Sequence, residues 1–170
     1  MAANPETLAP LLRRMTPADL DRVIDIERRA YPHPWTRGIF GDCLRVGYDC
    51  WCLQLGRAVT GYCVLSHAAG ETHLLNLCVA PEAQGRGLGA TLLGHALQRS
   101  ARHGSGEIFL EVRPSNHAAI ALYRRHGFRA VGERPDYYAA GEGRENAVIM
   151  VRALRANPAV RPGAPAGGMR

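Results

Sequence analysis

A glycine-rich turn over residues 84–90 carries the clearest chemical signal in the sequence. It reads Q-G-R-G-L-G-A, follows the apolar run 74–79 and opens a segment in which leucines recur at helical spacing. A turn that begins a helix leaves several backbone N–H groups without partners, with the positive end of the helix dipole behind them. Such a site binds phosphate, and Arg86 either adds positive charge there or is simply solvated. The turn therefore predicts a phosphorylated ligand.

Other residues narrow the kind of phosphate site. All 21 lysine-plus-arginine residues are arginines, which excludes a Walker-type loop because its lysine must reach the outer phosphates. Gly85, Gly87 and Ala90 imitate a dinucleotide fingerprint. That fingerprint directly follows the first strand of a βαβ unit, whereas here residues 80–84 intervene. A glycine-rich helix start that binds nothing is the remaining alternative.

Glu111 is a second candidate for chemistry. It interrupts the apolar run 108–110 just ahead of Val112, and the two-residue period of a strand places it on the same face as Phe109. A half-buried carboxylate in such surroundings can accept a proton directly or through a water. The alternative is a solvated strand glutamate or an ion-pair partner for Arg113. The residues alone leave both readings open.

Histidines and cysteines show no spacing typical of metal ligands. The seven histidines are scattered without an H-E-x-x-H, and the five cysteines contain no C-x-x-C pair. Four cysteines lie in apolar runs, where a thiol behaves as a small buried hydrophobe. Cys78 is one of these, so we expect it to be inert rather than a nucleophile. We expect no metal and a reduced, cytoplasmic setting.

The elements that must position these residues follow from periodicity and from capping and turn residues. They give the order β-α-α-β-β-β-α-β-α-β-β. Strands are expected over residues 11–15, 50–55, 59–66, 73–79, 107–112, 128–133 and 147–154, and helices over 16–30, 36–47, 88–102 and 114–126. Residues 31–35 read as an ordered loop, and a second loop containing Tyr137 and Tyr138 joins the last two strands.

Length and charge indicate a single folded domain. The 170 residues, 46% of them hydrophobic, suffice for one core. We expect a flexible lead over 1–10, a domain over 11–154 and a disordered, Pro/Gly/Ala/Arg-rich tail over 155–170. Four of the six excess positive charges lie from Arg152 onward, so we expect no direct nucleic-acid binding. We also expect no signal peptide and no membrane segment, and we favour a monomer.

The turn, taken with neighbouring segments, resembles a known family. Gln84, Gly87 and Gly89 after a strand ending V-A-P resemble the pyrophosphate-binding signature of the GNAT family of acetyl-CoA-dependent N-acetyltransferases. The likeness continues through the E-V-R-x-S-N run over 111–116, the helix segment 118–123 and the Gly-Phe pair at 127–128. Within the family, the sequence resembles the RimI branch more specifically. Its members are bacterial enzymes that acetylate the N-terminal alanine of a small-subunit ribosomal protein. The residues similar to that branch are Tyr31, Pro34-Trp35, 76–79, the E-V-R-x-S-N run, Tyr137-Tyr138 and 143–145.

This resemblance covers residues 11–154 and implies both a fold and a cosubstrate. The implied fold is the α/β (α+β) GNAT fold, a mixed central sheet of about seven strands with helices on both faces. The implied cosubstrate is acetyl-CoA. Its pyrophosphate would be bound by Gln84, Gly85, Arg86, Gly87, Leu88, Gly89 and Ala90. Asn116 would contact the pantetheine or its phosphate end, although an asparagine there could simply cap a helix.

The resemblance also implies how acetyl transfer would be catalysed. Glu111 would act as the base for the attacking amine, and Tyr123 as the acid for the departing thiolate, since a thiol titrates near pH 8.5 and a phenol near 10. Spacing alone makes Tyr123 at least as easily a core aromatic. If the strand 73–79 diverges from the next one, the backbone N–H groups of Leu77, Cys78 and Val79 can bind the thioester carbonyl and its oxyanion.

The implied reaction is acetylation of the α-amino group of an N-terminal alanine, with a small-subunit ribosomal protein as the favoured partner. Tyr31, Trp35, Tyr137 and Tyr138 could wall a groove for the peptide, or could simply be packing aromatics. Glu27 or Glu145 could attract basic residues of the peptide, or could simply be surface charges. Two alternatives remain at this point. One keeps the fold and cosubstrate but acetylates a small amine. The other is a non-enzymatic acyl-CoA sensor, which the presence of both Glu111 and Tyr123 argues against.

Overall fold

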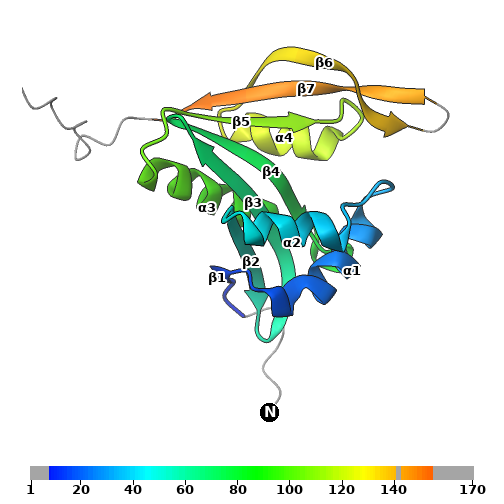
Figure 1. Ribbon diagram of the computed structural model, residues 1–170, viewed down its shortest axis with the longest axis vertical. Coiled ribbons are helices and arrows are strands. Elements are labelled where there is room, and N and C mark those ends of the chain that lie inside the picture. Colours follow the sequence, from blue (N-terminus) through cyan, green and yellow to red (C-terminus); the bar gives the residue numbers. More distant parts are fainter. Residues whose placement is uncertain (1–7, 141–142, 155–170) are drawn as a thin grey trace, which may run out of the picture.

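A seven-stranded mixed sheet organises the molecule, with strand order β1-β2-β3-β4-β5-β7-β6 (Figure 1). The computed structural model describes residues 8–140 and 143–154. The strands are β1 (Leu11–Arg14), β2 (Asp49–Leu55), β3 (Ala58–Ala68), β4 (Glu71–Val79), β5 (Glu107–Val112), β6 (Arg129–Ala140) and β7 (Gly143–Ala153). The helices are α1 (Leu20–Ala30), α2 (Arg37–Arg45), α3 (Leu88–Arg102) and α4 (His117–Arg125). This order confirms the expected fold class. The expected tail, and the lead up to residue 7, lie outside the described residues.

The two central strands separate halfway along their length. β4 and β5 are parallel neighbours, and their registered pairs run from Glu71↔Glu107 to Leu74↔Leu110. β4 then continues to Val79, still paired with β3, while β5 continues to Val112 beside β7. A bulge at Leu75 lies at the point of separation, because Leu74 pairs with Leu65 but Asn76 pairs with Val64. Bulges bend a strand locally, and here the result is a gap between β4 and β5.

Helices cover both faces of the sheet. Tyr62 of β3 contacts Phe40 of α2, with ring centroids 5.5 Å apart. Trp51 of β2 contacts His95 of α3 at 4.3 Å. Trp51 pairs with Cys63, the neighbour of Tyr62, so these two aromatics lie on opposite faces. Helices α1 and α2 therefore cover one face, and α3 covers the other beside α4.

The last two strands are longer than expected, which corrects one sequence prediction. Tyr137 and Tyr138 lie within β6 and not in a loop. Pro135 and two irregularities in register, at 130/132 and 134/138, disguise the strand in the sequence. Proline is tolerated here because β6 is the edge strand of the sheet, where its missing N–H breaks no inner ladder. The two tyrosines are therefore held by a paired strand.

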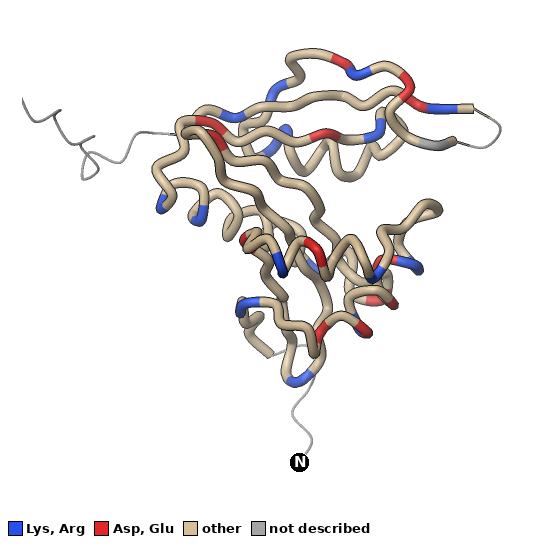
Figure 2. The backbone as a smooth tube through the Cα atoms, viewed as in Figure 1, with Lys and Arg blue, Asp and Glu red and all other residues tan. Residues whose placement is uncertain are grey.

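Charges of both signs are interspersed along the chain in Figure 2, over helices and strands alike. Several form ion pairs between elements, such as Arg13 with Asp19 at 2.8 Å and Arg29 with Glu82 at 2.7 Å. Among the described residues, no helix is both long enough and apolar enough to cross a membrane.

Candidate active site

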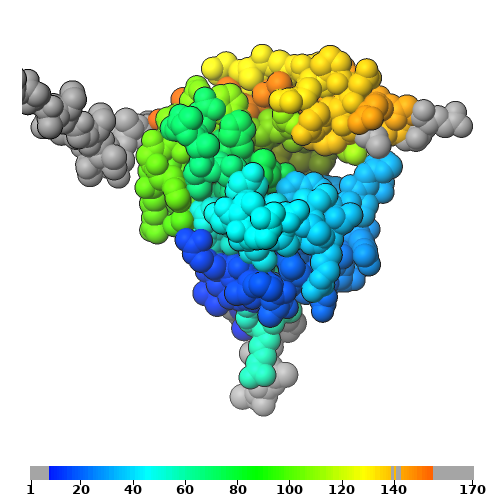
Figure 3. Space-filling model, viewed as in Figure 1, coloured from blue at the N-terminus to red at the C-terminus, as the bar shows by residue number. Residues whose placement is uncertain are grey.

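The gap between β4 and β5 opens into a cavity of about 560 Å³. Its walls come from the α1–α2 loop, the separated halves of β4 and β5, the start of α4 and the β6 segment around Tyr138. A second cavity, of about 550 Å³, is also lined by Glu111 and shares Trp35, Tyr137 and Tyr138 with the first. The space-filling view shows the surface hollowed between the β6–β7 hairpin (yellow to orange) and the segment around α1 and α2 (blue) (Figure 3).

The separated part of β4 presents backbone groups to this gap. The carbonyl of Leu77 accepts a hydrogen bond from the Tyr31 hydroxyl at 3.0 Å, and that of Val79 accepts one from the Gln84 amide at 3.1 Å. Both carbonyls therefore point away from β3. In a strand, the N–H and C=O of one residue lie on the same edge, so the N–H groups of Leu77 and Val79 also face the open edge. By the same alternation the N–H of Cys78 faces β3 and not the gap, unlike the sequence expectation. Donors at the open edge are suited to an oxyanion.

The glycine turn lies where β4 leads into α3. Gly85 and Gly87 have φ of 75° and 78°, a left-handed conformation that favours glycine, and a Cβ on either would meet nothing within 4 Å. The turn is thus open on its outer side, next to the first N–H groups of a 15-residue helix. This geometry fits a pyrophosphate. Arg86 is exposed beside it. Leu88 is buried, so its part in binding would be its backbone N–H.

Three residues of the expected cosubstrate site have visible structural roles. The Gln84 side chain ties the turn back to Val79, as described above. A Cβ on Gly89 would lie 3.3 Å from Leu122 Cδ2, so this glycine lets α3 approach α4 closely. Asn116 lines the cavity and its side chain accepts the Ala119 N–H at 3.2 Å, which makes it the N-cap of α4. The capping alternative therefore holds for Asn116, and its contact with the cosubstrate stays a prediction.

Glu111 lies at the junction of the two cavities and lines both. Its side chain is 24% exposed and its Oε1 lies 2.8 Å from Arg134 Nη2. A hydrogen bond with Glu111 also raises the pKa of Tyr137. The sequence suggested Arg113 as a possible ion-pair partner of Glu111, but Arg113 Nη1 lies 3.4 Å from Oε2 of Glu145. Glu111 is thus half-buried at a cavity, and its role as a base stays a prediction.

Tyr123 lines the first cavity from α4, the helix that follows β5. It is 8% exposed and its ring lies 5.7 Å from that of Phe128. Burial raises the pKa of Tyr123 above the usual phenol range. The hydroxyl therefore stays protonated near neutral pH, as a donor to a leaving sulfur must. The residue packs in the core and also borders the cavity, so the two readings of the sequence are compatible.

Four aromatic residues surround the cavities, as the sequence suggested. Tyr31 and Trp35 come from the end of α1 and the loop after it, and Tyr137 and Tyr138 come from β6. Trp35 also packs on Phe40 at 5.3 Å, and the two tyrosines of β6 contact each other edge to face at 4.8 Å. Burial is the largest cause that raises the pKa of Tyr138 to about 12. These rings both pack and line the openings.

Glu27 is a site residue whose role the sequence did not reveal. The sequence allowed it to attract basic residues of a substrate, but it is only 2% exposed. It accepts hydrogen bonds from the Trp35 N–H at 2.9 Å, from the Asn76 amide at 3.2 Å and from the Tyr62 hydroxyl. Glu27 therefore holds the α1–α2 loop against β4 at the cavity. Only the contact between distant segments shows this role.

Two further site predictions can be compared with their surroundings. Cys78 is 4% exposed, and burial raises the pKa of its thiol to about 11. A thiol that stays protonated at neutral pH is a poor nucleophile, in line with the expectation of an inert residue.

Glu145 accepts two hydrogen bonds from Ser115, one from the backbone N–H (2.9 Å) and one from the hydroxyl (3.1 Å). It thereby fastens β7 to the loop before α4.

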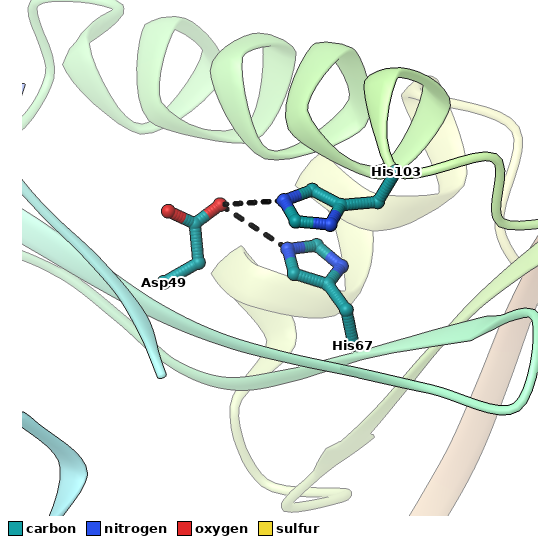
Figure 4. A group of neighbouring side chains, drawn as sticks. All are labelled: Asp49, His67 and His103. Carbon is teal, nitrogen blue, oxygen red and sulfur yellow. Dashed lines mark hydrogen bonds and ion pairs between the residues drawn. The ribbon is translucent and has the colours of Figure 1, made fainter. Parts of the chain in front are cut away.

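A separate charged cluster lies at the far end of α3 (Figure 4). Asp49, His67 and His103 come from β2, β3 and the end of α3, and their ligand atoms lie within 4.8 Å of one another. The two imidazole rings stack with centroids 3.8 Å apart. Sequence spacing could not reveal this group, because its members are 18 and 36 positions apart on three elements.

The charge balance of this cluster indicates a structural role. Asp49 Oδ2 accepts from Arg99 Nε at 2.7 Å, and Oδ1 accepts from Trp51 Nε1 at 2.7 Å and Arg14 Nη1 at 3.1 Å. Two guanidinium groups thus already neutralise the carboxylate, and a divalent cation beside them would be repelled. This donor set suits a hydrogen-bonded tie between β1, β2, β3 and α3 better than a metal centre.

Known proteins share this sequence pattern and fold. The family model described as the acetyltransferase (GNAT) family matches residues 20–128. The ribosomal protein bS18-alanine N-acetyltransferase of Escherichia coli K12 is 36% identical over 132 residues, 78% of this chain and 89% of that protein. The crystal structure of the S18-alanine enzyme from E. coli matches with a TM-score of 0.82 and 31% identity, covering 90% and 99% of the two chains. Ard1 from Thermoplasma volcanium, 24% identical over 86% and 99% of the two chains, shares the fold with a TM-score of 0.79.

Proposed function

Because the chain belongs to the GNAT family of acetyltransferases, we propose that it transfers an acetyl group from acetyl-CoA to the N-terminal alanine of a ribosomal protein. The E. coli relatives named for this activity on bS18 match most of the chain in sequence and in structure. The observation that carries the proposal is that Glu111, Tyr123 and the open edge of β4 border one cavity. An acceptor amine and a thioester need these three kinds of group together.

In the proposed reaction, Glu111 accepts a proton from the α-ammonium group of the acceptor, directly or through a water, and passes it to solvent. The neutral amine then attacks the thioester carbonyl carbon, and its nitrogen loses a second proton to Glu111 as the C–N bond forms. The N–H groups of Leu77 and Val79 stabilise the oxyanion that forms on the carbonyl oxygen. As the C–S bond breaks, Tyr123 donates its proton to the departing sulfur. The products are the acetylated terminus and the free thiol, and no covalent intermediate on the enzyme is required.

The cosubstrate grip in this proposal is the glycine turn. The open space outside Gly85 and Gly87 and the first N–H groups of α3 suit the pyrophosphate. The turn directly follows the β4 edge that would hold the acetyl carbonyl. One continuous segment, from Leu77 to Ala90, would therefore contact the cosubstrate along its length.

The acceptor would enter from the side of the two cavities. Trp35, Tyr137 and Tyr138 border both of them, so an extended peptide could place its first residue at Glu111 and continue along the second cavity. A ribosomal protein as acceptor also implies that the enzyme works in the cytoplasm, where ribosomes are assembled.

A direct test is to incubate the purified protein with acetyl-CoA and a peptide with the N-terminal sequence of bS18, and to follow thiol release. Peptides with the first alanine replaced by other residues test the specificity. The same peptide with a blocked N-terminus is the matched control, and mass spectrometry locates the acetyl group. We expect acetylation of the α-amine and preference for alanine.

Other outcomes separate the alternatives. Rapid acetylation of small amines, with the peptides left unmodified, would replace the proposal by a small-amine acetyltransferase. Binding of acetyl-CoA without thiol release from any acceptor would favour a sensor that only binds the thioester.

A further inference from the structure

The carboxylate proposed as the base already has a cationic partner in this structure. Arg134 Nη2 lies 2.8 Å from Glu111 Oε1. Arg134 belongs to β6, and its own side chain is 55% exposed, against 24% for Glu111. An amine acceptor also carries positive charge near neutral pH, since an α-amino group has a pKa of about 7.7–8.0. Both cations therefore suit the same oxygen atoms.

An irregularity in the edge strand directs Arg134 to this position. Arg134 pairs with Ala147 and Tyr138 with Glu145, so three residues of β6 face only Asn146 of β7. Asp136, in the middle of the three, has φ of 51°. Its N–H donates to Asn146 Oδ1 at 3.1 Å, and its carbonyl accepts from Arg144 Nε at 2.7 Å. Bulges re-aim side chains, and this one is held in shape by two side chains of β7.

The pair lies at the boundary between the two cavities. Glu111 lines both, whereas Arg134 lines the second, through which we propose that the acceptor enters. The guanidinium group packs over the Tyr137 ring at 5.3 Å, and the nearby Glu111 carboxylate raises the pKa of the Tyr137 hydroxyl. An ammonium group that reaches Glu111 from the second cavity therefore competes there with a guanidinium group.

We propose that Arg134 is a positioning residue that acts as a cation gate: it occupies the acceptor's place on Glu111 and is exchanged for the acceptor's ammonium group on binding. The exchange keeps the half-buried carboxylate neutralised in the empty enzyme. The free energy of acceptor binding then depends on the difference in strength between two ion pairs, that of Glu111 with the acceptor and that of Glu111 with Arg134. Cations that bind the carboxylate weakly therefore do not displace Arg134. The inference rests on the proposed function, because it assigns Glu111 to the acceptor amine.

The test compares Arg134→Met with the wild type and with Arg129→Met. Methionine keeps an unbranched apolar stem over Tyr137 but lacks the charge and the donors. Arg129 is an exposed arginine of the same strand that lines neither cavity, so it is the matched control. We expect Arg134→Met to lower KM for the acceptor about two- to fivefold, the size of an exposed ion pair, with kcat changed less than twofold. Arg134→Lys keeps a cation and should have a KM close to wild type.

Inhibition by methylguanidinium distinguishes the gate from a merely structural role of Arg134, which would not change this inhibition. It should inhibit Arg134→Met competitively with the acceptor, and at severalfold lower concentration than it inhibits the wild type or Arg129→Met. Thermal unfolding of each variant checks that the fold is retained.

Two results would overturn the gate. One is a higher KM in Arg134→Met, which would make Arg134 a residue that binds the acceptor. The other is an unchanged KM together with equal inhibition of all variants by methylguanidinium. Failure of the proposed function looks different, because the wild type itself would then leave the peptide unmodified. If the wild type acetylates a small amine instead, the same ratios of KM are measured with that amine.

Discussion

Asp49 and Glu111 are both carboxylates paired with arginine, and their surroundings give them opposite roles. Asp49 is 5% exposed and accepts from Arg99, Arg14, Trp51 and His67, which come from four elements. Glu111 is 24% exposed, and the partners described above, Arg134 and Tyr137, come from one bulged edge strand. Removing Asp49 would leave several buried donors unpaired, whereas the partner of Glu111 can move into solvent. Burial and the number of partners therefore distinguish a tie that holds the fold from a pair that can be exchanged.

The largest expected effect is on stability, from Asp49→Asn. Breaking a buried ion pair by removing one charge costs about 3–5 kcal/mol, because the two guanidinium groups lose their shared counter-charge. Urea unfolding followed by circular dichroism measures this, and kcat of the folded fraction should stay near wild type. Asp42→Asn is the matched control, since Asp42 pairs with Arg45 on the surface, with side chains 70% and 72% exposed. If Asp49→Asn lowered the free energy of unfolding no more than this control does, the contrast between Asp49 and Glu111 would be wrong.

The next largest effect is on turnover, from Glu111→Gln. A positioned general base contributes about 10²–10⁴-fold, so we expect kcat to fall within that range. The free energy of unfolding should change by less than about 1 kcal/mol, as for a solvent-accessible ion pair. Steady-state kinetics with acetyl-CoA and the bS18 peptide measure the first quantity. Glu107→Gln, on the same strand but outside both cavities, controls for the loss of a strand carboxylate. Wild-type turnover in Glu111→Gln would remove Glu111 from the base role.

Tyr123→Phe is expected to have a smaller effect than Glu111→Gln. The variant keeps the packing against Phe128 and loses only the hydroxyl, so we expect kcat to fall about 10–100-fold, near the lower end of general-acid contributions. The KM for acetyl-CoA should change little. Tyr48→Phe, an exposed tyrosine that is 39% accessible, is the control. If thiol release in Tyr123→Phe were as fast as in the control, another group would have to protonate the sulfur.

The smallest effect is the pH dependence of stability. Burial acts to raise the pKa of Asp49, but hydrogen bonds from Arg99, His67 and Trp51 hold it at about 2, below the unfolded value of about 3.9. The stabilisation is therefore present above pH 4 and is lost as the pH falls through about 2. Asp19, whose pKa its hydrogen bond from Arg13 lowers to about 2, acts in the same window. Between pH 4 and 2, Asp49→Asn should lose stability less steeply than wild type, and equal slopes would contradict this assignment.

The sequence predicts those elements and site residues whose signals come from neighbouring positions in the chain. The glycine turn, the strand before it and the helix after it lie within one stretch of the chain, residues 71–102, and the structure confirms these elements. Glu111 on its strand and Tyr123 on its helix were singled out from their positions and from the family resemblance. The structure brings both to one cavity, while their catalytic roles stay predictions.

What the sequence missed depends on contacts between distant segments. Glu27 read as a surface charge because an amphipathic helix does not show which polar residue meets a buried partner. The Asp49 cluster and the pair between Arg134 and Glu111 each join elements far apart in the chain. The sequence predicts a loop at Tyr137 and Tyr138, because residue types do not show the bulge that accommodates Pro135 within the strand.

One glycine of the turn has a consequence for how mutations there are interpreted. Gly89 allows α3, whose first N–H groups belong to the proposed phosphate site, to lie against α4, which carries Tyr123. A methyl group at this position would lie 3.3 Å from Leu122 Cδ2, so the Leu122 side chain or the helix that carries it would have to give by a few tenths of an ångström. The glycine turn, which we propose binds the cosubstrate, therefore also sets the distance between the start of α3 and the helix that carries Tyr123. Loss of activity in Gly89→Ala would then report misalignment as much as weaker cosubstrate binding, and only a separate affinity measurement would distinguish them.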